Sequence, residues 1–296
     1  MNKRIKSARQ VQQHQSLFHC PICQSFMEVH ESKSFICQKG HTFDFTKKGY
    51  INLTTRPSKT KYTKELFEAR RELMVEQQLF EPLLEKIDAW IQNTVSRQDA
   101  LTILDTGCGE GSHLARITEK LHNTFTNGVT GVGIDLSKEG IMTAAKNYPE
   151  TIWAVADLAH SPFRDQSFQL LLNILSPSNY GEFSRLLKNG GYVLKVVPQQ
   201  NYLTELRDAF FKDTDRASYS NDDTVDLFTR HFQLKDRIRV TYNVDLNPSS
   251  MQSLIQMTPL TWSISETDIQ AVLDKHSLSS ITVDLEILIG IKGHEK

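Results

Sequence analysis

The chain of 296 residues is 39% hydrophobic and 23% charged, which is enough to bury a full core and favours two domains. It contains no apolar run of about 18 residues that would span a membrane, and residues 1–15 are basic and polar without the apolar stretch of a secretory signal. The net charge of −1 hides an asymmetry: residues 1–64 carry twelve Lys and Arg against three Asp and Glu, and the remainder is acidic, which favours an anionic partner for the N-terminal part.

Residues 20–41 contain three of the four cysteines of the chain and a histidine. Cys20 and Cys23 form C-x2-C, and Cys37 and His41 form C-x3-H, a spacing typical of a tetrahedral zinc site. We expect a reducing, cytoplasmic compartment, in which clustered cysteines bind metal more often than they form disulfides. The segments FMEV and KSFIC between the ligand pairs alternate like two strands of a hairpin. Four ligands leave no open position, so the sequence predicts one structural zinc, with free thiols as the alternative.

Residues 42–64 interleave aromatic residues with basic ones, a mixture that can stack on bases and pair with phosphates. The sequence favours Phe43, Phe45 and Tyr50 as the small core of the zinc-binding module. The predicted RNA-binding residues are Lys47, Lys48, Arg56, Lys59 and Lys61, with Lys64 beside them. Residues 55–64 have no apolar face and are predicted to be a mobile linker. A solvated tail is the alternative for residues 1–15.

Residues 65–91 have the apolar spacing of a helix, which Pro82 is expected to divide into two. Strands and helices then alternate, and this pattern indicates a doubly wound, mostly parallel sheet. The predicted strands are 100–105, 130–135, 152–157, 168–175 and 191–197, and the helices between them include 113–122, 137–148 and 180–189. Two late β-rich segments, 237–244 and 281–291, are predicted to form an antiparallel edge hairpin on that sheet.

A glycine loop, Gly107-Cys108-Gly109-Glu110-Gly111, follows the first of these strands and opens a helix. Asp135 ends the second strand, where an acid can accept hydrogen bonds from ribose hydroxyls. The loop departs from the dinucleotide pattern G-x-G-x-x-G. Asp105, just before it, can pair with an ammonium group, so the loop favours S-adenosylmethionine. Asp157, at the end of the third strand, could accept from the adenine amino group, with a helix-capping role as the alternative for either later acid. Cys108 is interpreted as a packing residue.

These motifs together resemble the bacterial 23S ribosomal RNA (guanine-N1)-methyltransferases of the RlmA/TlrB type, over nearly the whole chain. The stretch from CPIC to GHTFDFTKKGYINL is similar to the zinc-finger signature of that family, and EARR at residues 68–71 to its linker helix. LDTGCGEG, GIDLSK and LLKNGG are similar to its cofactor motifs, and QMTPLTW at residues 256–262 to its late motif.

The resemblance implies a Rossmann-like class I methyltransferase sheet with a small N-terminal zinc-binding domain, S-adenosylmethionine as donor and a hairpin of 23S rRNA as substrate. It divides the chain into a zinc-binding, RNA-recognition domain (1–54), a basic linker with helices (55–93) and a methyltransferase domain (94–296). Phe80 and Tyr202 stand where one branch of the family has a tyrosine and a histidine on the cofactor side. The predicted cofactor-binding residues are therefore Phe80, Asp105, Gly107, Gly109, Glu110, Gly111, Asp135, Asp157 and Tyr202.

The residues also narrow the choice of the atom that accepts the methyl group. Methylation of a pyrimidine C5 needs a cysteine nucleophile, and the one cysteine outside the zinc set lies in the cofactor loop. The Asp/Asn-Pro-Pro-aromatic turn of exocyclic-amine methyltransferases is replaced by Leu175-Ser176-Pro177-Ser178. Guanine N1 remains a candidate acceptor, with Trp262 or Tyr180 as candidates to stack on a flipped base and a core position as the alternative for Trp262.

Two other functions remain open at the level of sequence. One is a small-molecule methyltransferase with an accessory zinc knuckle, and the other is a non-catalytic RNA-binding protein that uses the cofactor pocket as a sensor. The sequence leaves open which guanine is modified, which group accepts its proton and whether methylation confers macrolide resistance. It also leaves open the oligomeric state, a homodimer being one alternative.

Overall fold

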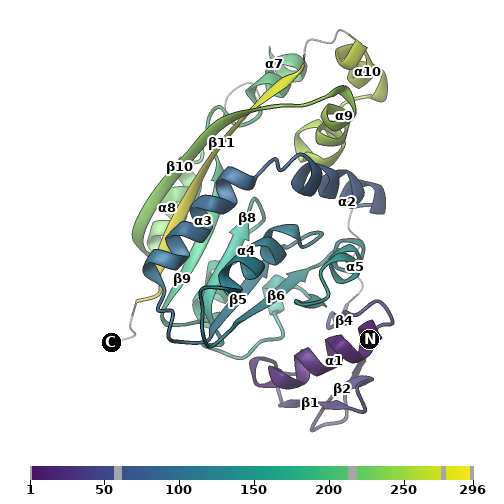
Figure 1. Cartoon of the computed structure of the whole chain (residues 1–296), viewed down its shortest axis with the longest axis vertical. Coiled ribbons are helices and arrows are strands. Elements are labelled where there is room, and N and C mark those ends of the chain that lie inside the picture. Colours follow the sequence, from purple (N-terminus) through teal and green to yellow (C-terminus); the bar gives the residue numbers. More distant parts are fainter. Residues whose placement is uncertain (1, 57–61, 213–218, 275–277, 294–296) are drawn as a thin grey trace.

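The computed structural model describes residues 2–56, 62–212, 219–274 and 278–293. An eight-stranded sheet with the order β10-β11-β9-β8-β5-β6-β7-β4 forms its centre (Figure 1). The strands are β4 (Ile51–Asn52), β5 (Leu101–Thr106), β6 (Val129–Asp135), β7 (Ile152–Val155), β8 (Phe168–Ile174), β9 (Leu187–Pro198), β10 (Gln233–Asp245) and β11 (Ser280–Ile291). The strands from β4 to β9 are parallel to one another. Strand β11 pairs antiparallel with β9, and β10 pairs antiparallel with β11. The predicted fold class is thus confirmed.

Helices cover both faces of this sheet, and each face has its own apolar cluster. One face carries α3 (Glu81–Thr94), α4 (Ser112–His122), α5 (Lys138–Asn147), α7 (Thr204–Phe211) and α9 (Pro248–Met257), and the other carries α1 (Lys3–Gln13), α6 (Tyr180–Leu186) and α8 (Asp222–His231). The short helix α10 (Glu266–Asp274) packs beside α9. No helix of the described residues is long and apolar enough to cross a membrane.

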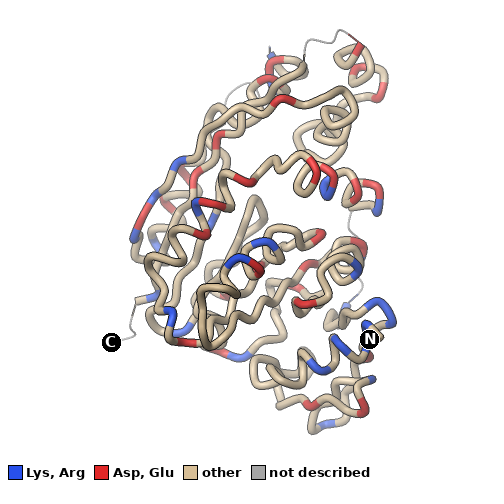
Figure 2. Tube along the Cα trace, in the orientation of Figure 1, with Lys and Arg blue, Asp and Glu red and all other residues tan. Residues whose placement is uncertain are grey.

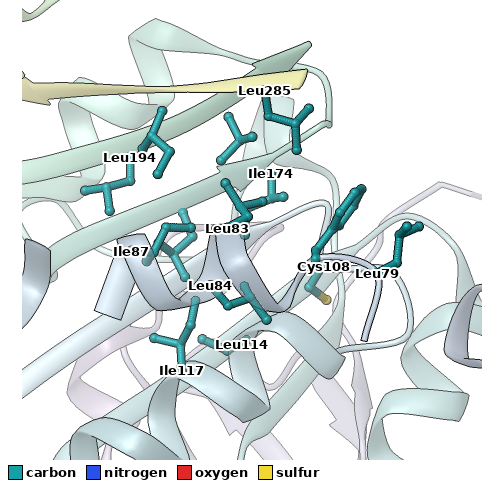
Figure 3. Close-up of a cluster of buried hydrophobic side chains, with 14 of the residues drawn as sticks. Leu79, Leu83, Leu84, Ile87, Cys108, Leu114, Ile117, Ile174, Leu194 and Leu285 are labelled. Atoms are coloured by element: carbon teal, nitrogen blue, oxygen red, sulfur yellow. The ribbon is translucent and has the colours of Figure 1, made fainter. Parts of the chain in front are cut away.

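The linker helix α2 (Lys64–Arg71) continues into a π-helical turn (Glu72–Glu76) before α3 begins. Pro82 lies in the first turn of α3, where its missing N–H costs nothing, so the predicted break is confirmed. Figure 3 shows how Leu83, Leu84 and Ile87 of α3 meet side chains of α4 and of the sheet. Cys108 joins this cluster and is buried, as expected of a packing residue.

One helix ends earlier than its sequence predicts. Residues 187–189 were expected to continue the helix that begins at Tyr180, but α6 ends at Leu186 and β9 begins at Leu187. Leu187 is fully buried and pairs with Phe168 of β8. Burial of this side chain and its strand pairing outweigh the helix propensity of the segment, which is a weak preference.

The N-terminal module packs against the edge of the large sheet. Its own sheet has three short antiparallel strands, β1 (Met27–His30), β2 (Ser34–Cys37) and β3 (Thr42–Asp44), which confirms the predicted hairpin. The next strand, β4, pairs with β7 of the large sheet, and Phe18 bridges to Phe163. Side chains of the module and of the sheet form one continuous apolar cluster. Among the described residues, single-turn 3-10 helices lie at Gln15–Leu17, Leu158–His160 and Pro259–Thr261.

Candidate metal centre and cofactor pocket

The four predicted zinc ligands come together in the N-terminal module. The ligand atoms of Cys20, Cys23, Cys37 and His41 all lie within 4.8 Å of one another. The sulfurs of Cys23 and Cys37 are 3.7 Å apart, and Nδ1 of His41 lies 3.6 Å from the sulfur of Cys20 and 3.4 Å from that of Cys37.

These distances match a tetrahedral zinc ion. With zinc–sulfur bonds of about 2.3 Å and zinc–nitrogen bonds of about 2.0 Å, two sulfurs stand about 3.8 Å apart and a sulfur and a nitrogen about 3.5 Å apart. Although burial opposes ionisation of the Cys37 thiol, hydrogen bonds from Ser25 and from the backbone of His41 hold its pKa at about 6, which favours the thiolate that zinc binds. The set fits one structural zinc, as predicted, and four protein ligands leave no position open for a substrate.

The second site is a cavity of about 290 Å³ at the carboxyl ends of the central parallel strands, where open α/β sheets bind their ligands. The sheet supplies one wall, and the linker helix α2 with the end of α9 supplies the other. The lining residues are Tyr62, Leu66, Phe67, Arg70, Gly107, Gly109, Ile134, Asp135, Leu136, Ala156, Leu158, Ile174, Leu175, Ser176, Pro177, Met257 and Pro259.

Two glycines of the loop stand at positions where a side chain would not fit. Gly107 has φ +75°, and a Cβ on it would lie 2.5 Å from Oγ of Ser176. Gly111 has φ +84°, and a Cβ there would lie 2.5 Å from the ring of Trp153. Both positions combine a left-handed backbone with a close contact, so only glycine fits them.

Asp135 lies in the wall of the cavity, at the end of β6. Its Oδ2 accepts a hydrogen bond from the amide of Gly109 at 2.9 Å, and Oδ1 accepts one from the amide of Ser137 at 2.7 Å. These bonds fix the carboxylate, and each oxygen keeps a lone pair for a further donor. Burial raises the pKa of Asp135, while the two amides oppose the rise. The carboxylate is therefore held ready to accept from two neighbouring hydroxyls, as a ribose offers.

Three further ionisable groups, Asp105, Glu110 and Arg70, lie in the glycine loop or beside it. Asp105 is 2% exposed, and its burial raises its pKa to about 7, with Arg70 opposing the rise and Asp135 and Glu110 adding to it. Glu110 is fully buried, binds the hydroxyl of Ser112 at 2.5 Å and lies 3.6 Å from Nε of Arg70. A buried acidic group therefore lies next to a guanidinium that lines the cavity.

Arg70 is a pocket residue that sequence reasoning did not assign. Its side chain lines the cavity, and its Nε is buried without a hydrogen-bond partner in the described structure. The EARR motif of the linker helix could have indicated this residue, because Arg70 is its third position. A guanidinium placed beside buried carboxylates suits the zwitterionic end of an amino acid, which needs both charges.

The predicted cofactor residues fall into two groups. Gly107, Gly109 and Asp135 line the cavity, with Asp105 and Gly111 directly behind it. Phe80 is buried against the ring of His113, and Asp157 caps the turn that begins at Leu158 by accepting from the amide of Ala159. Tyr202 packs against the main apolar cluster. None of Phe80, Glu110, Asp157 and Tyr202 lines the described cavity, and their roles as cofactor contacts stay predictions.

The predicted RNA-binding residues lie on the N-terminal side of the molecule. Lys47, Lys48 and Arg56 are exposed, whereas Lys59 and Lys61 are outside the described residues. Figure 2 shows basic positions along the N-terminal helix and in the loop beside the edge strand β4. Phe45 and Tyr50 are buried and Phe43 is partly buried, as predicted for a small core.

The two aromatic candidates for stacking on a base differ in their exposure. Trp262 is 40% exposed and packs edge-on against Tyr62, with the ring centres 5.3 Å apart, so it stands at the rim of the cavity. Tyr180 is 7% exposed and stacks on His231 inside an aromatic cluster, so a base has no access to its ring.

Known proteins match both parts of the chain. The family described as RlmA, N-terminal, matches residues 18–64, and a methyltransferase domain family matches residues 103–191. YxjB of Bacillus subtilis (strain 168), provisionally named a 23S rRNA (guanine-N(1)-)-methyltransferase, is 45% identical over 94% of this chain and 98% of its own. A 23S rRNA (guanine(748)-N(1))-methyltransferase of Streptomyces fradiae is 29% identical over 82% of this chain and 85% of its own. The YcgJ structure from Bacillus subtilis superposes with a TM-score of 0.48 at 15% identity, covering 71% of this chain and 100% of that one.

Proposed function

Because this chain belongs to the RlmA-type family of 23S rRNA (guanine-N1)-methyltransferases, we propose that it methylates N1 of a guanine in a hairpin loop of 23S rRNA. The observation that carries the proposal is the match to YxjB over nearly the full length of both chains, which includes the zinc-binding module and the sheet together. The methyl donor is S-adenosylmethionine.

Residues in and beside the cavity support this choice of donor. Asp135 accepts from the ribose hydroxyls, and the glycine loop lets the chain approach the nucleoside closely. Asp105 and Arg70 hold the ammonium and the carboxylate of the amino-acid end through opposite charges. When bound, S-adenosylmethionine presents an electrophilic methyl group on a sulfonium. The protein contributes orientation, since in-line transfer needs the base nitrogen fixed near that methyl group.

The zinc-binding module and the basic residues beside it are proposed to hold the RNA. Lys47, Lys48 and Arg56 offer exposed positive charge, and phosphate contacts of this kind position an RNA without reading its sequence. Trp262, at the rim of the cavity, is the proposed stacking partner of the target base once it leaves the loop. The zinc site requires reduced cysteines, and the substrate is ribosomal, so we place the enzyme in the cytoplasm.

The test is transfer from radiolabelled S-adenosylmethionine to unmodified 23S rRNA, followed by primer extension. Methylation of guanine N1 blocks base pairing, so reverse transcriptase is expected to stop next to a single guanine in a hairpin loop. Label that enters only small molecules would support a small-molecule methyltransferase. RNA binding without transfer would support a non-catalytic role.

A further inference from the structure

Lys195 is a buried lysine behind the turn that closes one end of the cavity. It lies on β9 and is 5% exposed. Its Nζ donates to Oδ1 of Asn173 at 2.8 Å and to the carbonyl oxygen of Ser176 at 3.4 Å. Among the ion pairs of the described residues, none involves Lys195.

A stabilising role does not account for this lysine. Its neighbours on the same face of β9 are Val193 and Val197, both buried, and its partner on β11 is Leu288. An isolated charge in such surroundings costs free energy, which an apolar side chain of similar length would avoid. Burial lowers the pKa of Lys195 to about 8, so the ammonium is still charged at neutral pH.

The contacts of Lys195 lead directly to the cavity through Asn173. The amide nitrogen of Asn173 donates to Oγ of Ser176 at 2.8 Å and to the carbonyl oxygen of Pro177 at 3.0 Å. Ser176 and Pro177 line the cavity, and Leu175 before them has φ +51°. An ammonium has donors but no acceptor, so it fixes the oxygen of the Asn173 amide toward β9 and the nitrogen toward the turn.

We propose that the acceptor base lies against the turn 175–177 and that Lys195 is a positioning residue for methyl transfer, which holds Asn173 and this turn in place and sets a positive charge behind it. The proposal rests on the proposed function. A guanine loses its N1 proton to solvent, N1 takes the methyl group, and the electron pair of the broken S–C bond stays on sulfur. A positive charge behind the turn favours the anionic form of the base, and a fixed turn favours in-line attack.

The first test is Lys195→Met, which keeps the length of the side chain and removes the charge. We expect kcat for 23S rRNA to fall at least tenfold, while the Kd of S-adenosylmethionine and the KM for RNA stay within twofold. The melting temperature of the protein without ligand is expected to stay equal or to rise, because a lone buried charge is removed. A kcat within twofold of wild type, or a loss of kcat that parallels a loss of donor affinity, would overturn the proposal.

Lys292 offers a matched control. It is also buried, and it donates to the carbonyl oxygen of Leu187 at the opposite end of β9. Lys292→Met should leave kcat within twofold, whereas an equal loss in both variants would mean that any buried lysine of this sheet has the same effect. Wild-type protein that fails to methylate the RNA in this assay would instead contradict the proposed function itself.

A second variant tests the path through Asn173. Asn173→Ala should lower kcat, and the double variant with Lys195→Met should lose less than the product of the two single losses, since both changes release the same turn. Losses that multiply in full would show that Lys195 acts through its charge alone, and would overturn the positioning role.

Discussion

Ile51 pairs with Ala154, and through this pairing a strand of the N-terminal module becomes the edge of the large parallel sheet. Ile51 is fully buried, as is Phe18 on the same module, and both belong to an apolar cluster that continues into the sheet. The module that holds the zinc ligands is therefore anchored to the methyltransferase sheet by backbone pairing and by side-chain packing.

The first prediction concerns the metal. Cys37→Ser should remove the zinc and, because the module shares a core with the sheet, lower the melting temperature of the whole protein. Atomic absorption should give one zinc per chain for wild type and none for the variant. The control is Cys108→Ser, which makes the same change at a buried cysteine outside the site and should retain the metal. Wild-type protein that contains no zinc when freshly purified would contradict the assignment.

The second prediction concerns Asp135. Asp135→Ala removes an acceptor for two ribose hydroxyls, and the loss of charge-assisted hydrogen bonds should cost roughly 2–4 kcal/mol of donor binding. Calorimetry should show the affinity for S-adenosylmethionine falling at least tenfold. Asp236→Ala is the control, since that carboxylate is exposed on β10 at the far edge of the sheet. Unchanged affinity in Asp135→Ala would place the nucleoside elsewhere.

The third prediction separates the two ends of the donor. Arg70→Met should weaken S-adenosylmethionine binding about tenfold through loss of a charged hydrogen-bond donor, but should leave binding of 5′-methylthioadenosine unchanged, because that molecule lacks the amino-acid end. Arg71→Met is the matched control at the next position, where the side chain pairs with Glu76. Equal losses for both ligands would show that Arg70 acts on the fold of the pocket instead.

The fourth prediction concerns pH. Burial raises the pKa of Asp105 to about 7. This carboxyl therefore stabilises the folded state fully at a pH below its pKa in the unfolded chain, and the contribution is lost as the pH rises through about 7. Asp105→Asn should therefore raise the melting temperature of the ligand-free protein at pH 8 and have little effect at pH 4.

The same titration should govern binding of the donor. Only ionised Asp105 pairs with an ammonium, so the affinity for S-adenosylmethionine should increase about tenfold from pH 6 to pH 8 in wild type. Asp105→Asn should flatten that profile. Arg70, Asp135 and Glu110 face Asp105, and a profile that keeps its slope in Asp105→Asn would assign the titration to one of the other two acids.

The fifth prediction concerns the RNA. Replacing Lys47, Lys48 and Arg56 together by glutamine should raise the KM for RNA and reduce the slope of log affinity against log salt by about 0.7 for each phosphate that the protein no longer neutralises. Donor affinity should stay within twofold. The control pair is Arg230 of α8 and Lys235 of the far edge strand β10, both exposed. An unchanged KM in the triple variant would locate the RNA surface elsewhere on the protein.

Much of the candidate site could be predicted because its residues are close in sequence. The four zinc ligands lie within 22 positions, 20 to 41, so a hairpin and two tight turns suffice to bring them together. The glycine loop likewise joins β5 to α4 directly, and the acid at the end of β6 follows from the order of a doubly wound sheet.

Other features depend on contacts between distant segments. No local pattern shows that Ile51 will join the large sheet or that the linker will place Arg70 in the wall of the cavity. Nor does one show that Lys195 will contact Asn173 on the neighbouring strand. Trp262 and Tyr180 are both aromatic residues near predicted elements, yet one is exposed at the cavity and the other is buried. Their difference arises from packing, because burial is decided by which helices and strands meet in the folded chain, and that depends on register and side-chain fit over the whole molecule.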